Sequence, residues 1–241
     1  IADIAAAAFD AVGITTGAPH TAAASLSPGT GLDYIISVTN DGQYLDLSAS
    51  DGTLLTTVYE DGVLDKPSVT DNGEQIVFVN NAHQIVGVEI AYNDGSIQYN
   101  TGIVSEDTPW RNAAISKDGR FLAGLTTLND NKVIIFDLAN PTGPEPREYF
   151  LVNPTNVQGV EWVDNVAYAD VIEFDYSSTH LIYDAFSILE NAEGEDISNW
   201  DIGLLEFWKD GQYAPNDTPN IRKLISQLPE HVGVADPAFS K

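Results

Sequence analysis

Residues 113–124 read AAISKDGRFLAG, and this stretch decides the fold. Apolar and polar residues alternate on both sides of Asp118-Gly119, which is the pattern of two short β-strands joined by a tight turn. Glycine adopts the positive φ that such turns require, so Asp-Gly between alternating runs is a strong hairpin signal. The stretch therefore predicts one hairpin, and the next question is whether the chain repeats it.

The same pattern does return along the chain. Each copy has an apolar residue followed by Ser, Thr or Asp, a turn residue shortly afterwards, and then an apolar strand. The further copies are SVTDNGEQIVFV (68–79), EFDYSSTHLIYDAF (173–186), the looser ASLSPGTGLDYIISV (24–38), and the start of a fifth, DPAFSK (236–241). Such internal periodicity indicates a repeat architecture.

The four complete copies are also alike in the segments that come after them. A further strand comes next, as QYLDL (43–47), QIVGVEI (84–90), KVIIFDL (132–138) or DIGLLEF (201–207). A turn sequence and a last strand then complete each unit, with the turns written SDG (50–52), NDG (93–95), NPTG (140–143) and KDG (209–211). Four-stranded antiparallel units at intervals of about 40 to 60 residues are typical of β-propeller blades. A β-sandwich with hairpins of similar length is the alternative.

The repeat divides the chain into blades, and we expect an all-β fold of about four blades plus one strand. The expected blades are 26–66, 67–109, 110–159 and 160–232, with 233–241 starting another blade or closing the ring. Residues 1–25 are rich in alanine and fit no unit, so they are expected to be a linker or the remnant of a preceding blade. The partial fifth copy favours a piece of a larger propeller.

The units resemble those of TolB-type propellers, whose blades carry a pattern close to FSPDGKxIAF…DIYVMDxDG. The matching stretches are VTDNGEQIVF (69–78), ISKDGRFLAG (115–124) and WDIGLLEFWKDG (200–211). Two departures are the NPTG turn, which lacks Asp-Gly, and Ser178, which stands where the turn glycine is expected. The resemblance implies a propeller of six or more blades. With it we expect a prokaryotic exported protein, extracellular or periplasmic.

The charge of the chain limits its partners. Its 36 acidic and 10 basic residues give a net charge of −26, which repels nucleic acid phosphates and anionic lipids. The same field favours basic partners and divalent cations. No apolar run is long enough for a membrane-spanning helix, and the absence of cysteine excludes a disulfide framework.

The most acidic stretch, ENAEGEDISNWD (190–201), is a candidate calcium site. Hard carboxylate oxygens gathered in one loop are suitable Ca²⁺ ligands, although the spacing is not that of an EF-hand. A solvated acidic loop without a metal is the alternative. The candidate ligands are Glu193, Glu195, Asp196 and Asp201.

Two tryptophans and an arginine are candidate ligand-binding residues. Trp110 and Arg111 precede the innermost strand of their blade, so they border the expected channel mouth, where propeller ligands commonly dock. Trp200 lies within the acidic stretch. Indole rings stack on sugars and peptides, but they also fill cores, so packing between blades is the alternative.

The repeated turn chemistry and the lack of any recognised catalytic motif favour a non-catalytic platform that binds a protein or a glycan, with Ca²⁺ as a candidate cofactor. One alternative is a hydrolase or lyase acting on glycans or peptides. It would use carboxylates across the channel, such as Glu161, Asp170 or Glu173, or a catalytic domain outside this chain. The other alternative is a structural surface or filament subunit.

Overall fold

The computed structural model describes residues 20–22, 34–93, 96–106, 109–127, 131–140, 146–151, 166–190, 196–215 and 221–223, together with Pro237 and Phe239. Every regular element in these residues is a β-strand, and all strand pairs are antiparallel. No helix in this part of the chain could therefore cross a membrane.

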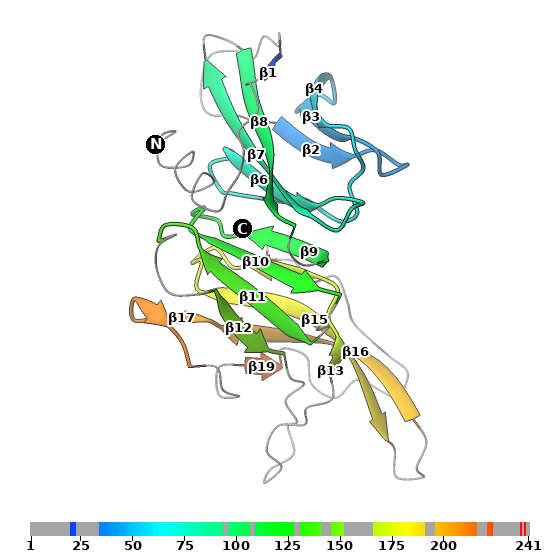
Figure 1. Cartoon of the computed structure of the whole chain (residues 1–241), viewed down its shortest axis with the longest axis vertical. Coiled ribbons are helices and arrows are strands. Elements are labelled where there is room, and N and C mark those ends of the chain that lie inside the picture. Colours follow the sequence, from blue (N-terminus) through cyan, green and yellow to red (C-terminus); the bar gives the residue numbers. More distant parts are fainter. Residues whose placement is uncertain are drawn as a thin grey trace.

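The strands form four sheets that follow one another in chain order, and we call them blades 1 to 4 (Figure 1). Blade 1 contains β2 (Tyr34–Val38), β3 (Leu45–Ala49) and β4 (Leu54–Tyr59). Blade 2 contains β5 (Ser68–Val69), β6 (Gln75–Val79), β7 (Ile85–Asn93) and β8 (Ser96–Ser105). Blade 3 contains β9 (Trp110–Ile115), β10 (Phe121–Thr126), β11 (Lys132–Asp137) and β12 (Arg147–Phe150).

Blade 4 is the least regular sheet. It contains β13 (Val166–Tyr168), β14 (Ile172–Phe174), β15 (His180–Glu190), β16 (Asp196–Glu206) and β19 (Ile221–Lys223), with β13 and β14 both paired to β15. A small hairpin of β17 (Trp208–Lys209) and β18 (Gln212–Tyr213) follows β16. The long β15–β16 hairpin projects at the lower right of Figure 1.

The packing of the blades confirms the all-β propeller prediction. A separate apolar core fills each junction between consecutive blades: blade 1 with blade 2, blade 2 with blade 3, and blade 3 with blade 4. A β-sandwich would have one core between two sheets, so the sequential cores exclude that alternative. The sheets are arranged as the blades of a β-propeller, and the extent of a larger propeller stays a prediction.

The ends of the expected blades are only partly visible. The first strand expected for blade 1, near residues 26–33, and most of 233–241 lie outside the described residues. β1 (His20–Ala22), within the stretch expected to be a linker or blade remnant, pairs antiparallel with β8 and so extends blade 2.

The repeated turns have the same hydrogen bonds in blades 2 and 3. The Thr70 hydroxyl donates to Asn72 Oδ1 at 2.7 Å, and the Ser116 hydroxyl donates to Asp118 Oδ1 at 2.6 Å. Gly73 and Gly119 close these turns with φ values of 73° and 75°. The repeat in the sequence therefore encodes a repeated turn, which side-chain hydrogen bonds between residues two apart stabilise in each copy.

Blade 4 achieves the same turn without glycine. Ser178 adopts a φ of 56°, a conformation that costs a non-glycine residue free energy. Its Oγ accepts a hydrogen bond from the backbone N–H of Asp118 at 3.3 Å, so it links the turn of blade 4 to that of blade 3. The departure at Ser178 thus has a structural role between blades.

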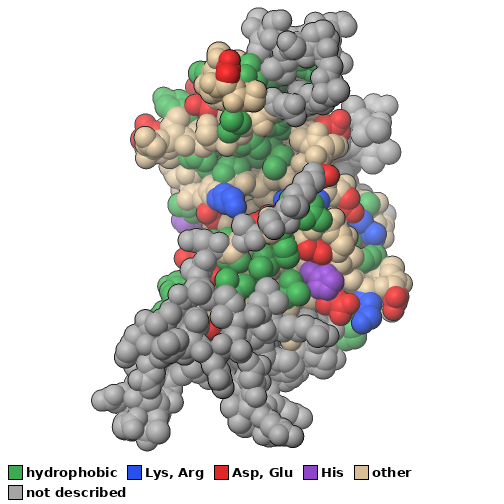
Figure 2. Space-filling view, turned by 180° about the vertical axis from the view of Figure 1, so that it is seen from behind, with side chains coloured by type: hydrophobic (Ala, Val, Ile, Leu, Met, Phe, Trp, Pro, Cys, Tyr) green, Lys and Arg blue, Asp and Glu red, His purple; other side chains and the backbone are tan. Residues whose placement is uncertain are grey.

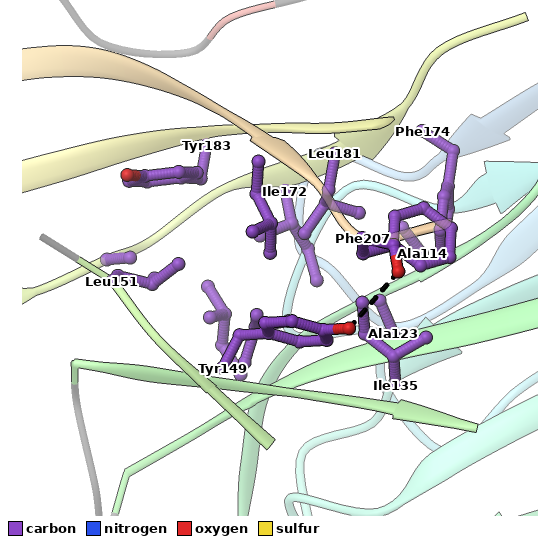
Figure 3. Close-up of a cluster of buried hydrophobic side chains, with 14 of the residues drawn as sticks. Ala114, Ala123, Ile135, Tyr149, Leu151, Ile172, Phe174, Leu181, Tyr183 and Phe207 are labelled. Carbon is purple, nitrogen blue, oxygen red and sulfur yellow. Dashed lines mark hydrogen bonds between the residues drawn. The ribbon is translucent and has the colours of Figure 1, made fainter. Parts of the chain in front are cut away.

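The core between blades 3 and 4 is shown in Figure 3. Tyr149 is 1% exposed, and its hydroxyl is shared between the carbonyl oxygens of Phe207 at 3.1 Å and Ala214 at 2.9 Å. Burial raises the pKa of Tyr149 to about 12, so this hydroxyl stays a neutral donor. The aromatic core thereby fixes the chain that leaves β16.

Because of Asp175, we expect the free energy of unfolding to fall as the pH is lowered in the acidic range. Burial alone would raise the pKa of this carboxyl, but hydrogen bonds from Ser177 Oγ and from the backbone N–H groups of His180 and Thr179 outweigh it and lower the pKa below its ordinary value. The Asp175 carboxylate therefore makes its full contribution to stability above the ordinary aspartate pKa, about 3.9. This contribution is lost as the pH falls through the lower pKa of the folded state. Urea unfolding should show Asp175→Asn less stable than the parent at pH 6, with a gap that shrinks below about pH 4. A gap that stays constant to pH 3 would contradict this assignment.

Candidate ligand surface at the inner strands

Arg111 connects the first strand of blade 3 to blade 4. Its Nη1 donates to the carbonyl oxygen of Ala169 at 3.3 Å and lies 3.6 Å from Asp170 Oδ1. Its guanidinium carbon lies 4.9 Å from the centre of the Tyr168 ring. The side chain keeps 24% of its surface exposed.

Tyr168, Phe186 and Trp200 form an aromatic cluster on three neighbouring strands of blade 4. The strand register pairs Tyr168 with Phe186 and Phe186 with Trp200, so the three side chains share one face of the sheet. Their ring centres all lie 5.1 to 5.4 Å from one another, and the rings of Tyr168 and Trp200 meet edge to face. All three residues are partly exposed. The cluster and Arg111, which lies over the Tyr168 ring, together make a surface that we call the aromatic surface.

A buried carboxylate holds the segment beside this surface. Asp184, on β15, is 1% exposed, and its Oδ1 accepts hydrogen bonds from the backbone N–H groups of Asp170 and Val171, each at 2.8 Å. Because Asp170 is the partner of Arg111, Asp184 positions the acidic group that orients the arginine.

A second feature, the inner cavity, lies between the first strands of blades 2, 3 and 4. It has a volume of about 170 Å³ and is lined from the chain around β5, β9 and β14. Its charged lining residues are Lys66, Lys117 and Glu173, and Asn112 adds an amide. An adjacent hollow of about 410 Å³ shares Lys66 with it and reaches Tyr34 on blade 1. Asn112 follows Arg111 directly on β9, so the cavity and the aromatic surface are neighbours along one strand.

Of the three expected ligand-binding residues, two lie on the aromatic surface and the third, Trp110, lies in a core. Arg111 and Trp200 both contact Tyr168 and belong to the aromatic surface. Trp110 is only 2% exposed: its Nε1 donates to Ser105 Oγ at 3.1 Å, and its ring lies against Gly124 and Phe136. The Trp110 ring thus contributes to the core between blades 2 and 3 and presents no face to solvent.

The acidic stretch is not one continuous loop. β15 extends to Glu190 and β16 begins at Asp196. The strand expected from Asp201 therefore starts five residues earlier, and Asp196 belongs to it and not to the expected loop. Asp201 is 5% exposed and lies opposite Ala185. Glu193 and Glu195 lie outside the described residues. Within the described ranges, no group of three acidic or histidine side chains is placed to hold a metal ion, and calcium binding stays a prediction.

The candidate catalytic carboxylates have structural partners. Asp170 faces Arg111, and Glu173 Oε1 lies 3.4 Å from Lys117 Nζ. Glu161 lies outside the described residues. Tyr168 and Phe186, which complete the aromatic surface, carry no motif, and only the strand register could have identified them.

The comparisons with known proteins concern the fold. No family model matches the sequence, and the search of curated proteins found no match. Similar solved structures include the dihydro-heme d1 dehydrogenase NirN in complex with DHE, with 10% identity, a TM-score of 0.42, and coverage of 83% of this chain and 48% of that one. The β-propeller domain of Swd1 from Myceliophteria thermophila has 16% identity and a TM-score of 0.45, covering 77% of this chain and 53% of that one.

Hsv2p from Kluyveromyces lactis has 11% identity and a TM-score of 0.42, covering 78% of this chain and 50% of that one. The chain thus spans about half the length of these structures. Identities this low concern the fold alone, and the fold assignment rests on the strand pairing described above.

Proposed function

We propose that this chain is a non-catalytic interaction platform whose ligand docks on the aromatic surface, and that a glycan is the favoured ligand, with a protein segment as the alternative. The observation that carries the proposal is the cluster of Tyr168, Phe186 and Trp200, three partly exposed residues on one face with Arg111 over the Tyr168 ring. Large rigid rings provide contact area at a low cost in conformational entropy.

The cluster suits a glycan because its rings are partly exposed and already packed against one another. Aromatic side chains pack on the C–H faces of sugar rings. Phe186 and Trp200 are fixed by direct cross-strand pairing, so the surface is formed before a ligand arrives.

The turn chemistry supports a relation to TolB-type propellers, and with it we propose an exported protein in the periplasm or outside the cell. The Thr70–Asn72 and Ser116–Asp118 hydrogen bonds are the same in two copies of the repeated motif. A calcium ion in the segment around Glu193 and Asp196 remains part of the proposal. An increase in thermal midpoint on adding Ca²⁺, reversed by a chelator, would support it.

Replacing Trp200 should remove most of the binding. We expect native electrophoresis through gels containing uncharged polysaccharides to retard the parent chain, and Trp200→Ala to weaken that retardation at least tenfold in apparent affinity, or about 1.4 kcal/mol. Tyr168→Ala should have a similar effect because Tyr168 contacts both Trp200 and Arg111.

Tyr44→Ala is the matched control, since Tyr44 is 42% exposed on blade 1, outside the aromatic surface. Retardation unchanged in Trp200→Ala and Tyr168→Ala would refute the proposed surface. Retardation by none of the polysaccharides, together with binding of a peptide that depends on Trp200, would replace the glycan by the protein alternative.

A further inference from the structure

Blade 1 has one face packed against blade 2 and one face that points away from it. Leu45 and Leu47 of β3 belong to the core between the two blades, and alternate side chains along a strand lie on opposite faces of its sheet. The strand register therefore places six other side chains on the face away from blade 2, which we call the outer face of blade 1: Ile35, Ser37, Asp46, Ser48, Leu54 and Thr57.

Large apolar side chains are exposed on this outer face. Ile35 is 48% exposed and Leu54 is 57% exposed, and the register places both beside the small Ser48. Tyr44, which is 42% exposed, continues the alternation of β3, and its carbonyl oxygen accepts a hydrogen bond from the backbone N–H of Thr39 at 3.0 Å. Single exposed apolar side chains are ordinary, but several on one sheet face indicate an interaction surface.

The sequence of blade 1 carries acidic residues and no basic ones. The first lysine or arginine of the whole chain is Lys66. From Tyr34 to that residue, the acidic residues are Asp41, Asp46, Asp51, Glu60, Asp61 and Asp65. Figure 2 shows this end of the molecule at the upper left, with red carboxylates among green hydrophobic side chains. Blade 1 therefore combines exposed apolar side chains with a field of one sign.

Three of these carboxylates follow the middle strand of the blade. Asp46 lies on the outer face within β3, and Asp41 and Asp51 lie in the turns at its two ends. A hydrogen bond from the Thr39 hydroxyl lowers the pKa of Asp41, and one from the backbone N–H of Thr53 lowers the pKa of Asp51. Both turn carboxylates therefore stay charged in mildly acidic solution.

We propose that the outer face of blade 1 binds a basic segment of a partner protein. Apolar side chains of the segment pack on Ile35 and Leu54, and its lysine or arginine side chains pair with the carboxylates along β3. Burial of the apolar side chains supplies affinity, while the charges select and orient the segment. This inference goes beyond the proposed function, because it concerns another surface and another ligand.

The charge of the face selects this partner over others. A second copy of the chain brings the same net charge of −26, so its approach is repelled. Nucleic acids and anionic membranes are repelled for the same reason. A neutral apolar partner would cover Asp46 without supplying a counter-charge, which costs free energy. Lysine or arginine next to apolar side chains is the complementary chemistry.

The test is fluorescence anisotropy with three labelled, amidated peptides. KVKIKVK is basic and alternates with apolar residues, KSKGKSK is basic without them, and EVEIEVE is acidic. We expect saturable binding of KVKIKVK to the parent chain, at least about tenfold tighter than that of either other peptide. Raising the salt from about 0.05 to 0.5 M should weaken this binding several-fold, because the exposed charge pairs are screened.

Substitutions on the outer face should weaken the binding of KVKIKVK. We expect a loss of at least about fivefold for Ile35→Ser and for Leu54→Ser, and of about two- to fivefold for Asp51→Asn. Ile103→Ser is the matched apolar control, since Ile103 is 41% exposed on β8 of blade 2. Glu148→Gln on β12 is the charge control. Urea unfolding checks that each variant keeps the stability of the parent.

Several outcomes would overturn the inference. They are no saturable binding of KVKIKVK, equally tight binding of KSKGKSK, and binding unchanged in both Ile35→Ser and Leu54→Ser. A dimer of the parent in sedimentation that Leu54→Ser dissociates would assign the face to a second copy instead. Peptide binding that depends on Trp200 and not on Leu54 would move the peptide to the aromatic surface. Polysaccharide retardation should be the same in Leu54→Ser as in the parent, so either proposal can fail while the other stands.

Discussion

Phe121→Ala is expected to destabilise the folded chain by about 3–5 kcal/mol, the usual range for removing a fully buried phenylalanine. Phe121 is 1% exposed at the junction of blades 3 and 4. Its ring centre lies 5.1 Å from that of Phe207, 5.0 Å from that of Trp208 and 6.3 Å from that of Tyr213. The substitution removes the ring that joins β10 to the β17–β18 hairpin, and neighbouring rigid rings cannot collapse into the space.

The free energy of unfolding, measured by urea titration with far-ultraviolet circular dichroism, checks this expectation. Phe150→Ala is the matched control, because Phe150 lies in the same blade but is 48% exposed. Its loss should cost less than about 0.5–1 kcal/mol. Equal effects of the two substitutions would mean that blades 3 and 4 do not share the core described here.

The sequence predicts the blades well because their turns are local. Ser116, Asp118 and Gly119 close a turn through atoms within a few residues of one another, so the pattern that encodes the turn can be read from the chain. Thr70 makes the equivalent hydrogen bond in blade 2, and the similar residues at the two turns are what identifies the repeat. Local chemistry of this kind depends little on the rest of the fold.

The parts that the sequence misplaces depend on non-local pairing. The polar residues from Asp196 onward indicate a loop, but their strand is fixed by pairing with β15, as in Ala185 with Asp201 and Phe186 with Trp200. Tertiary pairing outweighs local preference in such strands. Trp110 is expected just before the innermost strand but is the first residue of β9, and the small residue against its ring, Gly124, admits it into the core.

At the candidate site too, residue types can be read from the sequence while the contacts between them cannot. Arg111 and Trp200 can be proposed from residue type alone, but their common partner, Tyr168, lies far from both in sequence. The ion pair of Glu173 with Lys117, and the inner cavity that both residues line, depend on three blades meeting. A local sequence motif predicts neither kind of contact, because the pattern within one strand does not depend on which distant strand packs against it.

Asp184→Ala should destabilise the chain by about 2–5 kcal/mol, because it removes two hydrogen bonds to a charged acceptor, each worth about 1.5–3 kcal/mol, from part-buried backbone N–H groups. Both groups, of Asp170 and Val171, lie 2.8 Å from the lost oxygen. The released segment carries the partner of Arg111, so polysaccharide retardation should weaken even where the variant remains folded. Urea unfolding and gel retardation of the same preparation separate the two effects.

Asp184→Asn distinguishes the hydrogen bonds from the charge. An asparagine keeps an oxygen that can accept from the same two N–H groups, so we expect it to recover most of the stability lost in the alanine variant, to within about 1–2 kcal/mol of the parent. It should also recover retardation, because the segment that holds Asp170 against Arg111 is again anchored. If the asparagine variant is as unstable as the alanine variant, the negative charge itself holds the segment, and Asp184 does not act by positioning Asp170 through hydrogen bonds.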